Sequence, residues 1–168
     1  MSDMYKEILV KRKTSAANQL AKAGVIALTA VGLVGGIVFM FIPFLVIGIA
    51  GGVACYFLVP KLDVEYEYLY VNGDLDIDAI YSRQKRKKVA EYTSAELELL
   101  APENSHALDS YKNKKDMKVR DFTSGEPQKK NYIMVMNKDK GQELVKVELD
   151  EAIVNDLRRM APRKVNLM

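Results

Sequence analysis

The chain has 168 residues, which is enough for one ordinary soluble domain or for a smaller domain joined to a membrane segment. Its net charge of +3 is too small for a surface that tracks nucleic-acid phosphates, which needs a marked excess of clustered Lys and Arg. The single cysteine, Cys55, excludes an internal disulfide and a cysteine-based metal cluster.

The first segment, residues 1–17, is basic and contains a short amphipathic pattern. Asp3 is placed to cap a short helix in which Tyr5, Ile8 and Leu9 share one side. Such a helix suits an anionic membrane surface. The alternative is a basic flank that only sets the orientation of the segment after it.

An apolar stretch follows, in which every residue from Ala23 to Pro60 is uncharged. A single membrane-spanning helix needs about 20 residues, with an upper limit near 25. Pro43 lies in the middle of the stretch, and proline disfavours helix at the residue before it. The pattern predicts a transmembrane helical hairpin over residues 18–60 with a break near Pro43. The alternative is one long, kinked helix.

Small residues recur in both predicted helices. Two pairs have the spacing that allows close backbone approach, namely Gly32 with Gly36 and Gly48 with Gly52. Cys55 is expected to be a small buried hydrophobe. No Asp, Glu, Lys, Arg or His lies between Lys22 and Lys61, which argues against an independent channel or transporter.

Basic residues flank the outer ends of the predicted hairpin and are absent from its turn. Lys61 follows the second helix, and five basic residues precede or begin the first, namely Lys6, Lys11, Arg12, Lys13 and Lys22. Because basic residues stay on the cytoplasmic side, the pattern predicts a multi-pass protein of the cell membrane with both termini cytoplasmic.

Beyond Pro60 the pattern changes to the alternation of β-strands, which marks a predicted soluble domain over residues 61–168. Residues 64–70 and 75–81 alternate in this way. Between them, Asn72 and Gly73 form the pair best suited to a type I′ turn, since both central residues of that turn need a positive φ. A β-hairpin is therefore predicted here.

Five further strands and a closing helix follow. The strands are predicted over residues 87–92, 96–100, 117–122, 132–136 and 143–149. The helix covers residues 150–161, with Asp150 as its N-cap and Pro162 beyond its end. Its apolar face comprises Ile153, Leu157 and Met160.

Seven strands followed by one amphipathic helix is the element order of a pleckstrin-homology-like (PH-like) barrel; the alternative is a small open sheet packed on one helix. The chain resembles a family of uncharacterised bacterial membrane proteins, mainly of clostridial type, with a double membrane span. The resemblance is carried by residues 64–68, 72–78 and 83–88. It implies an α+β membrane protein, a transmembrane helical hairpin plus a mainly β, PH-like domain with a C-terminal helix, and it implies no known activity.

The basic run after the hairpin is the candidate contact site. It comprises Arg83, Lys85, Arg86, Lys87 and Lys88. These side chains suit anionic lipid headgroups or a protein partner. The alternative is internal pairing with the acidic strands at residues 63–67 and 74–78.

Other residues indicate no catalytic, cofactor or metal site. Asp74, Asp76 and Asp78 alternate like the start of an EF-hand loop, but Ala79 and Lys85 stand where that loop needs Gly and Glu. These aspartates are expected on the solvent face of a strand. His106 is the lone histidine, so neither a two-histidine metal site nor a Cys/His pair is available.

The sequence thus favours a membrane-anchored cytosolic interaction or scaffold module that is not an enzyme and needs no cofactor. Its expected partners are the lipid bilayer and an unidentified protein, with no nucleic acid and no small-molecule substrate. The alternatives are a module that senses anionic lipid, an accessory subunit of a larger membrane complex, and a membrane-bound hydrolase that uses clustered carboxylates.

Overall fold

The computed structural model describes residues 4–114, 117–139 and 141–167. The chain forms two compact units, which are described separately. The β unit comprises residues 1–12, 65–80 and 86–168, and the helical unit comprises residues 13–64 and 81–85. The helical unit is therefore inserted into the sequence of the β unit.

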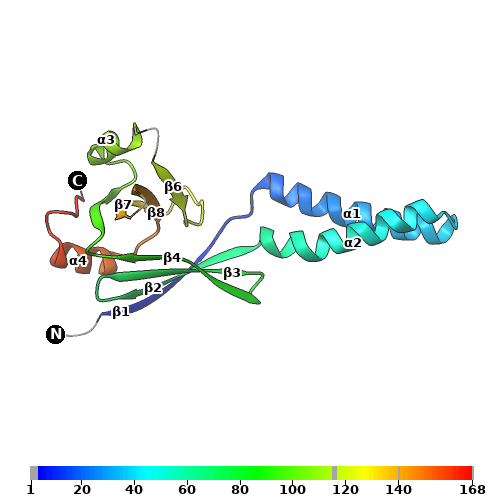
Figure 1. Cartoon of the computed structure of the whole chain (residues 1–168), viewed down its shortest axis with the longest axis horizontal. Helices are drawn as coiled ribbons and strands as arrows, with labels where there is room; N and C mark the ends of the chain where they lie inside the picture. The colour runs from blue at the N-terminus through cyan, green and yellow to red at the C-terminus, as the bar shows by residue number, and fades with distance from the viewer. Residues whose placement is uncertain (1–3, 115–116, 140, 168) are drawn as a thin grey trace. The chain divides into compact units, whose positions relative to one another are not determined.

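The first sheet of the β unit has four strands in the order β1-β2-β3-β4. Their bounds are Tyr5–Lys11 for β1, Val64–Val71 for β2, Asp74–Tyr81 for β3 and Lys85–Thr93 for β4 (Figure 1). Asn72 and Gly73 connect β2 to β3 with φ values of 48° and 98°, as a type I′ turn requires. The β-hairpin predicted from this pair is confirmed.

The predicted short helix near the N-terminus is wrong, because residues 5–11 form β1 and pair antiparallel with β2. Asp3, its expected cap, lies outside the described residues. Within this short segment apolar residues occupy both alternating and helical positions, so its own pattern favours neither structure. The neighbouring strand decides the outcome, since β2 offers seven consecutive register partners from Glu65 to Val71.

The second sheet has the order β5-β7-β8-β6, in which β6 runs parallel to β8. The strands are Leu97–Pro102 for β5, Lys118–Asp121 for β6, Tyr132–Lys138 for β7 and Gly141–Val147 for β8. Two short helices, η1 (His106–Leu108) and α3 (Asp109–Lys112), lie between β5 and β6. Within the described residues the eight strands form two separate sheets, so the closed barrel that the element order suggested is not found.

The core of the β unit is rich in tyrosine. Tyr68 and Tyr70 on β2 are fully buried, and each hydroxyl has a partner. Tyr68 donates to the Phe122 carbonyl at 2.8 Å, while Tyr70 donates to Asp156 Oδ2 at 2.7 Å. Asp156 belongs to the C-terminal helix, α4 (Glu151–Met160). These bonds join the first sheet to the loop after β6 and to α4.

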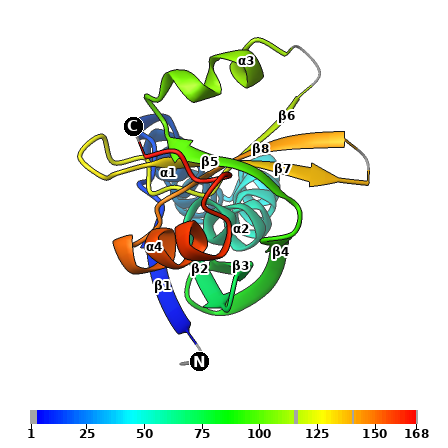
Figure 2. The ribbon, with the colours of Figure 1, turned by 90° about the vertical axis from the view of Figure 1, so that its left-hand side faces the viewer.

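The helix α4 begins as predicted. Asp150 is its N-cap and accepts a hydrogen bond from the Ala152 amide at 2.8 Å. Ile153, Val154 and Leu157 are buried, whereas Met160 stays 47% exposed. After α4 the chain returns to the second sheet, where the Leu100 amide donates to the Lys164 carbonyl at 2.7 Å (Figure 2). This C-terminal segment covers the outer edge of β5.

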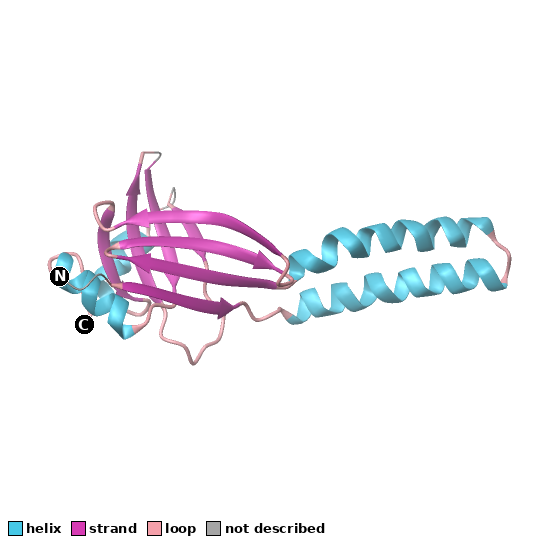
Figure 3. Cartoon of the chain, turned by 90° about the horizontal axis from the view of Figure 1, so that it is seen from below, coloured by secondary structure: helices cyan, strands magenta, loops and turns pink. Residues whose placement is uncertain are grey.

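The helical unit is a hairpin of α1 (Ala16–Val38) and α2 (Ile42–Leu62), which run side by side in Figures 1 and 3. By length and composition both helices are able to cross a membrane. The turn between them includes Met40, whose φ is 51°, and Pro43 lies in the first turn of α2, where its missing N–H costs nothing. The single kinked helix is not found.

Glycines bring the two helices together. A Cβ built on Gly32 would lie 2.7 Å from the Gly48 nitrogen, and one on Gly48 would lie 2.6 Å from the Leu33 nitrogen. Gly36 and Gly51 are also buried at this interface. The second predicted pair is therefore corrected from Gly48 and Gly52 to Gly48 and Gly51, because Gly51 faces Thr29 more closely.

We predict that Gly48→Ala weakens the hairpin by about 1–3 kcal/mol, because the new methyl group meets main-chain atoms that have no room to move. Gly24→Ala is the matched control, since nothing lies within 4 Å of its Cβ position. That control should be neutral or gain up to about 1 kcal/mol of helix propensity. Unfolding of the full chain in detergent measures the stability of both variants. Equal unfolding midpoints for Gly48→Ala and Gly24→Ala would contradict the close helix interface.

Candidate functional site

The outward face of the first sheet carries charged and apolar side chains together. The β1–β2 register pairs Tyr5 with Val71, Glu7 with Leu69, Leu9 with Glu67 and Lys11 with Glu65. Directly paired residues project to the same side of a sheet, and successive residues alternate. The side chains of these paired residues therefore project from the face of the sheet that is turned away from the buried tyrosines of β2. Tyr5 is 63% exposed and Leu9 is 57% exposed.

Two members of the predicted basic run are engaged in ion pairs across this face. Arg86 donates from Nε to Asp78 Oδ2 at 2.6 Å and also pairs with Glu67. Lys88 Nζ lies 2.9 Å from Asp76 Oδ2 and 2.8 Å from Glu91 Oε2. Hydrogen bonds to these two carboxylates raise the pKa of Lys88 to about 12. Internal pairing, the alternative for this run, holds for Arg86 and Lys88.

The other three members lie elsewhere, so the run is not one patch. Lys85 and Lys87 alternate with Arg86 and Lys88 along β4 and point to its other side. Arg83 lies in the β3–β4 turn, which is tied to the end of α2. The tie is made by Ser82, whose amide donates to the Asp63 carbonyl at 2.9 Å and whose hydroxyl donates to the Pro60 carbonyl at 3.3 Å.

This turn has a strained backbone. Ser82 and Arg83 have φ values of 48° and 57°, a region that residues other than glycine rarely adopt. The hydrogen bonds of Ser82 hold that conformation in place. As a result, Arg83 and Lys85 are held within the helical unit, next to the last turn of α2.

Glu67 is an unusual residue on an outward face, because only 7% of it is exposed. Burial and a hydrogen bond shared with Glu7 raise the pKa of Glu67, and Arg86 offsets this only in part. The carboxylate of Glu67 is thus held close to Glu7 on β1 and to Arg86 on β4. These contacts join the edge strand to the middle of the sheet.

The three aspartates of β3 do not form a cation site. Asp76 and Asp78 accept from Lys88 and Arg86, and Asp74 is exposed. Among the described residues no group of three or more His, Cys, Asp or Glu side chains is arranged to hold a metal ion. His106 is 99% exposed, and its Nδ1 lies 3.2 Å from Asp109 Oδ2.

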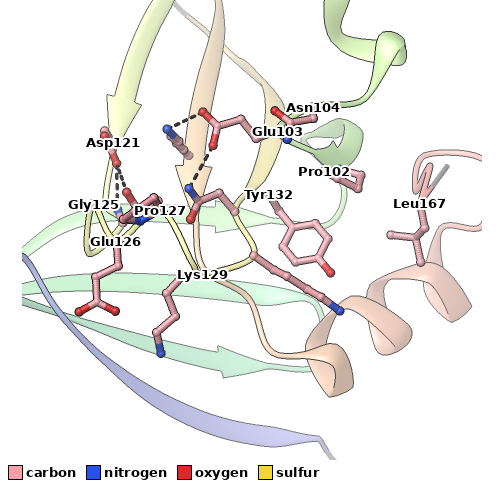
Figure 4. A pocket seen from close by; sticks show the side chains of 14 residues that line it. Pro102, Glu103, Asn104, Asp121, Gly125, Glu126, Pro127, Lys129, Tyr132 and Leu167 are labelled. Carbon is pink, nitrogen blue, oxygen red and sulfur yellow. Dashed lines mark hydrogen bonds and ion pairs between the residues drawn. The ribbon is translucent and has the colours of Figure 1, made fainter.

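A hollow of about 690 Å³ lies beside the loop that joins β6 to β7 (Figure 4). Its wall is built from Glu103, Asn131 and Lys146, which form a connected group. Lys146 Nζ lies 2.6 Å from Glu103 Oε1, and Asn131 Nδ2 donates to Glu103 Oε2 at 3.0 Å. The Asn131 Oδ1 atom is buried and has no hydrogen-bond partner among the described residues.

The chemistry of this hollow suits binding better than proton transfer. Burial opposes ionisation of Glu103, but the bonds from Lys146 and Asn131 outweigh burial and lower the pKa of Glu103. A general acid at neutral pH needs the opposite shift. Asp121, also in the wall, accepts from the Thr123 amide and hydroxyl at 2.9 and 2.8 Å and so fixes the loop.

The free edge of β1 is the other feature open to a partner. The Asn72 amide donates to the Met4 carbonyl at 3.1 Å, so Met4 and Asn72 are a hydrogen-bonded pair of the ladder. Bonded and non-bonded pairs alternate in an antiparallel ladder. The main-chain groups of Lys6, Ile8 and Val10 therefore face β2. The main-chain groups of the residues between and beside them face away from β2, namely those of Tyr5, Glu7, Leu9 and Lys11.

A groove of about 440 Å³ runs beside this edge. Residues 8–11 of β1 form one wall, and residues 124–130 and 148–150 contribute to the other. Ser124 fixes that second wall, since its amide and hydroxyl both donate to Glu148 Oε1. All of these residues belong to the β unit. The groove places an extended chain within reach of the outward main-chain groups of β1.

Two other sheet edges, those of β5 and β4, carry contacts from elsewhere in the chain. The C-terminal segment covers β5, as described above. On β4, the carbonyls of Val89 and Glu91 accept from the side chains of Arg120 and Lys138. For the outward groups of β1 no such partner is found within residues 4–114, 117–139 and 141–167. An uncovered edge is a template for another strand.

Comparison with known families agrees with this fold. Residues 2–167 match the family described as Bacterial PH-like domain (DUF6106). The chain belongs to this family. The match to Bacterial PH-like domain (DUF6106) spans both the apolar helices and the β unit, which confirms the PH-like membrane protein predicted from the resemblance. No curated protein and no solved structure matches the chain.

Sequence reasoning missed both the hollow and the edge. The residues of the hollow come from separate parts of the chain, Glu103, Asn131 and Lys146, and no local pattern connects them. The edge was missed because residues 5–11 were expected to be helical. The local pattern did not decide between the two structures, since Lys6, Ile8 and Val10 alternate with Glu7 and Lys11 as in a strand, while Leu9 breaks the alternation.

We predict opposite pH dependences for Glu67→Gln and Glu91→Gln. The raised pKa of Glu67 means that its ionisation costs stability, so the wild type should lose stability relative to Glu67→Gln as pH rises above 4.5. Lys88 lowers the pKa of Glu91, so the wild type should lose stability relative to Glu91→Gln as pH falls below 4.5. Thermal unfolding of the full chain across this range measures both, and profiles of the same sign would be inconsistent with the assigned contacts.

Proposed function

We propose that this chain is a membrane-anchored cytosolic interaction module, without catalytic activity, that binds an extended segment of a protein at the free edge of β1. The observation that carries the proposal is the uncovered edge itself, with its outward main-chain groups and the groove beside it. Strand addition of this kind takes its affinity from main-chain hydrogen bonds and its selectivity from side chains.

The anchoring part of the proposal rests on α1 and α2. Between Ala23 and Pro60 their exposed side chains are uncharged and almost wholly apolar, as a lipid-facing surface requires. Basic residues precede α1, Lys61 lies in the last turn of α2, and the turn between the helices is uncharged. By the positive-inside rule both ends of the hairpin lie in the cytoplasm, and the β unit lies there with them.

A second candidate function is the sensing of anionic lipid. The observation in its favour is the position of Arg83 and Lys85, which are held next to the end of α2 by the bonds of Ser82. Basic groups at a helix end lie at headgroup depth when the helix spans a bilayer. Arg86 and Lys88 lie among the carboxylates of the first sheet, whereas Arg83 and Lys85 belong to the helical unit, so lipid contact would involve the latter two residues by their position.

Two further alternatives receive less support. A hydrolase that uses clustered carboxylates needs a proton donor or an activated base, and the lowered pKa of Glu103 is unsuited to a proton donor. An accessory subunit of a larger membrane complex is a particular form of the interaction module. Its partner would then contact the same edge or the apolar surface of the hairpin.

Photo-crosslinking in intact membranes tests the proposed function. A photoreactive residue at Leu9 of the full chain should form adducts with protein, because an added strand lies directly against it. The control position is Val119, which is 65% exposed on β6 of the same unit. Protein adducts at Val119 alone, or adducts only with lipid at Leu9, would contradict binding at the β1 edge.

Lipid titration followed by native mass spectrometry tests the second candidate. The full chain in detergent should bind anionic lipid several-fold more weakly when Arg83 and Lys85 are changed to Gln. The same change at Arg86 and Lys88 should have little effect, because those groups are engaged with Asp76, Asp78 and Glu67. Equal losses from both double variants would show that the whole basic run contacts lipid.

A further inference from the structure

We infer that the segment added to β1 is β1 of a second copy of this chain, antiparallel and with Leu9 opposite Leu9. This inference rests on the proposed function, in which β1 accepts an added strand, and it specifies the partner. The result would be a two-fold symmetric dimer with one continuous sheet of eight strands across the interface.

The residues on either side of Leu9 make β1 complementary to an antiparallel copy of itself. Two residues before Leu9 stands Glu7, and two residues after it stands Lys11; its direct neighbours are Ile8 and Val10. In an antiparallel pair centred on Leu9, Glu7 of each copy faces Lys11 of the other. The interface thus has two attractive charge pairs on either side of an apolar centre, and directly opposite charges stabilise such pairs.

The main-chain geometry agrees with this register. The outward groups of β1 belong to Glu7, Leu9 and Lys11 among others, as the Met4–Asn72 bond requires. In the proposed register these residues face one another, so they exchange hydrogen bonds without any shift of the strand. The exposed side chain of Leu9 is also covered by its own counterpart.

Neighbouring registers lack this complementarity. Centring the pair on Ile8 puts Glu7 opposite Leu9 and Lys11 opposite Tyr5. Centring it on Val10 puts Lys11 opposite Leu9, and centring it on Glu7 brings two carboxylates together. Among the central positions of β1, Leu9 is thus the one that places opposite charges against each other twice.

On the other face of the strand, the register centred on Leu9 places one pair of like charges together, Lys6 opposite Arg12. Both groups are held within their own chain by contacts shorter than the 3.9 Å between Lys11 Nζ and Glu65 Oε1. Lys6 Nζ lies 2.6 Å from Asp150 Oδ2, and Arg12 donates to the Tyr66 hydroxyl at 2.9 Å. Arg12 also lies beyond the last residue of β1, so the ladder needs only residues 7–11.

Charge on an edge strand usually deters pairing with other strands. On the outward face of β1 the two charges, Glu7 and Lys11, have opposite sign and symmetric positions, so they deter most strands but favour a second copy. Five residues a side is a small contact, and the anchors would add to it by confining the copies to one membrane. Self-association is therefore expected mainly in the membrane.

Cysteine crosslinking of the full chain in liposomes tests the register. In a Cys55→Ala background, Leu9→Cys should give a crosslinked dimer with a short bismaleimide, because the two Leu9 Cα atoms lie about 5.5 Å apart in such a pair. Tyr5→Cys is equally exposed but should not, since the two copies of residue 5 lie roughly 27 Å apart, eight residues at about 3.4 Å each. Equal yields at both positions, or no dimer at Leu9, would overturn the inference.

Charge exchange tests the pairing independently. Glu7→Lys alone and Lys11→Glu alone should each weaken self-association roughly tenfold, because two attractive pairs become repulsive. A mixture of the two variants should form heterodimers at close to wild-type strength, since every Lys then faces a Glu. Energy transfer between labelled copies in liposomes measures this, and thermal unfolding confirms that each variant is folded.

The outcomes separate the two proposals. A photo-adduct at Leu9 with a different protein, combined with no crosslink at Leu9→Cys, would retain the interaction module and reject the dimer. A dimer that forms equally from each single charge variant would reject the register. If a charge variant does not fold, the comparison of Leu9→Cys with Tyr5→Cys still decides the inference.

Discussion

The pairing of β1 with β2 is the contact on which the rest of the structure depends. The chain leaves the first sheet after Lys11, forms two apolar helices and returns at β2, where Glu65 is the register partner of Lys11. The helical hairpin is thus an insertion between two neighbouring strands. This pairing places Glu7 beside Glu67, aligns the tyrosines of β2 toward the core, and leaves the outer main-chain groups of β1 without a partner among the residues that the structure describes.

Charge in this protein mainly organises the sheet. Acidic side chains of β2 and β3 and basic side chains of β4 neutralise one another across adjacent strands, with Arg86 and Lys88 as the two bridges. In the sequence the basic run of residues 83–88 resembles one anion-binding surface. In the structure the run is divided, because successive residues of β4 project to opposite sides of the sheet. What reaches the end of α2 is the smaller part of the run, Arg83 and Lys85.

Most of the elements were predictable because their signals are local. The Asn72-Gly73 turn requires positive φ, Asp150 caps a helix, and an uncharged stretch of this length with a central proline predicts two helices. The conformation of residues 5–11 depends on pairing with β2, which is far away in sequence, and the β1 edge exists only because of that pairing. The hollow around Asn131 likewise brings together residues from separate parts of the chain. The arrangement into two sheets depends on pairings between distant strands, notably the parallel pairing of β6 with β8.

The insertion of the helices between β1 and β2 also has a consequence for biosynthesis. β1 leaves the ribosome before the two apolar helices, and its partner strand β2 is made only after both of them. The first sheet is therefore completed after the hairpin has emerged and had the opportunity to enter the bilayer, and long-range pairing of this kind is slow. Until then β1 has both edges open, so the order of translation makes membrane insertion an early step and sheet assembly a late one.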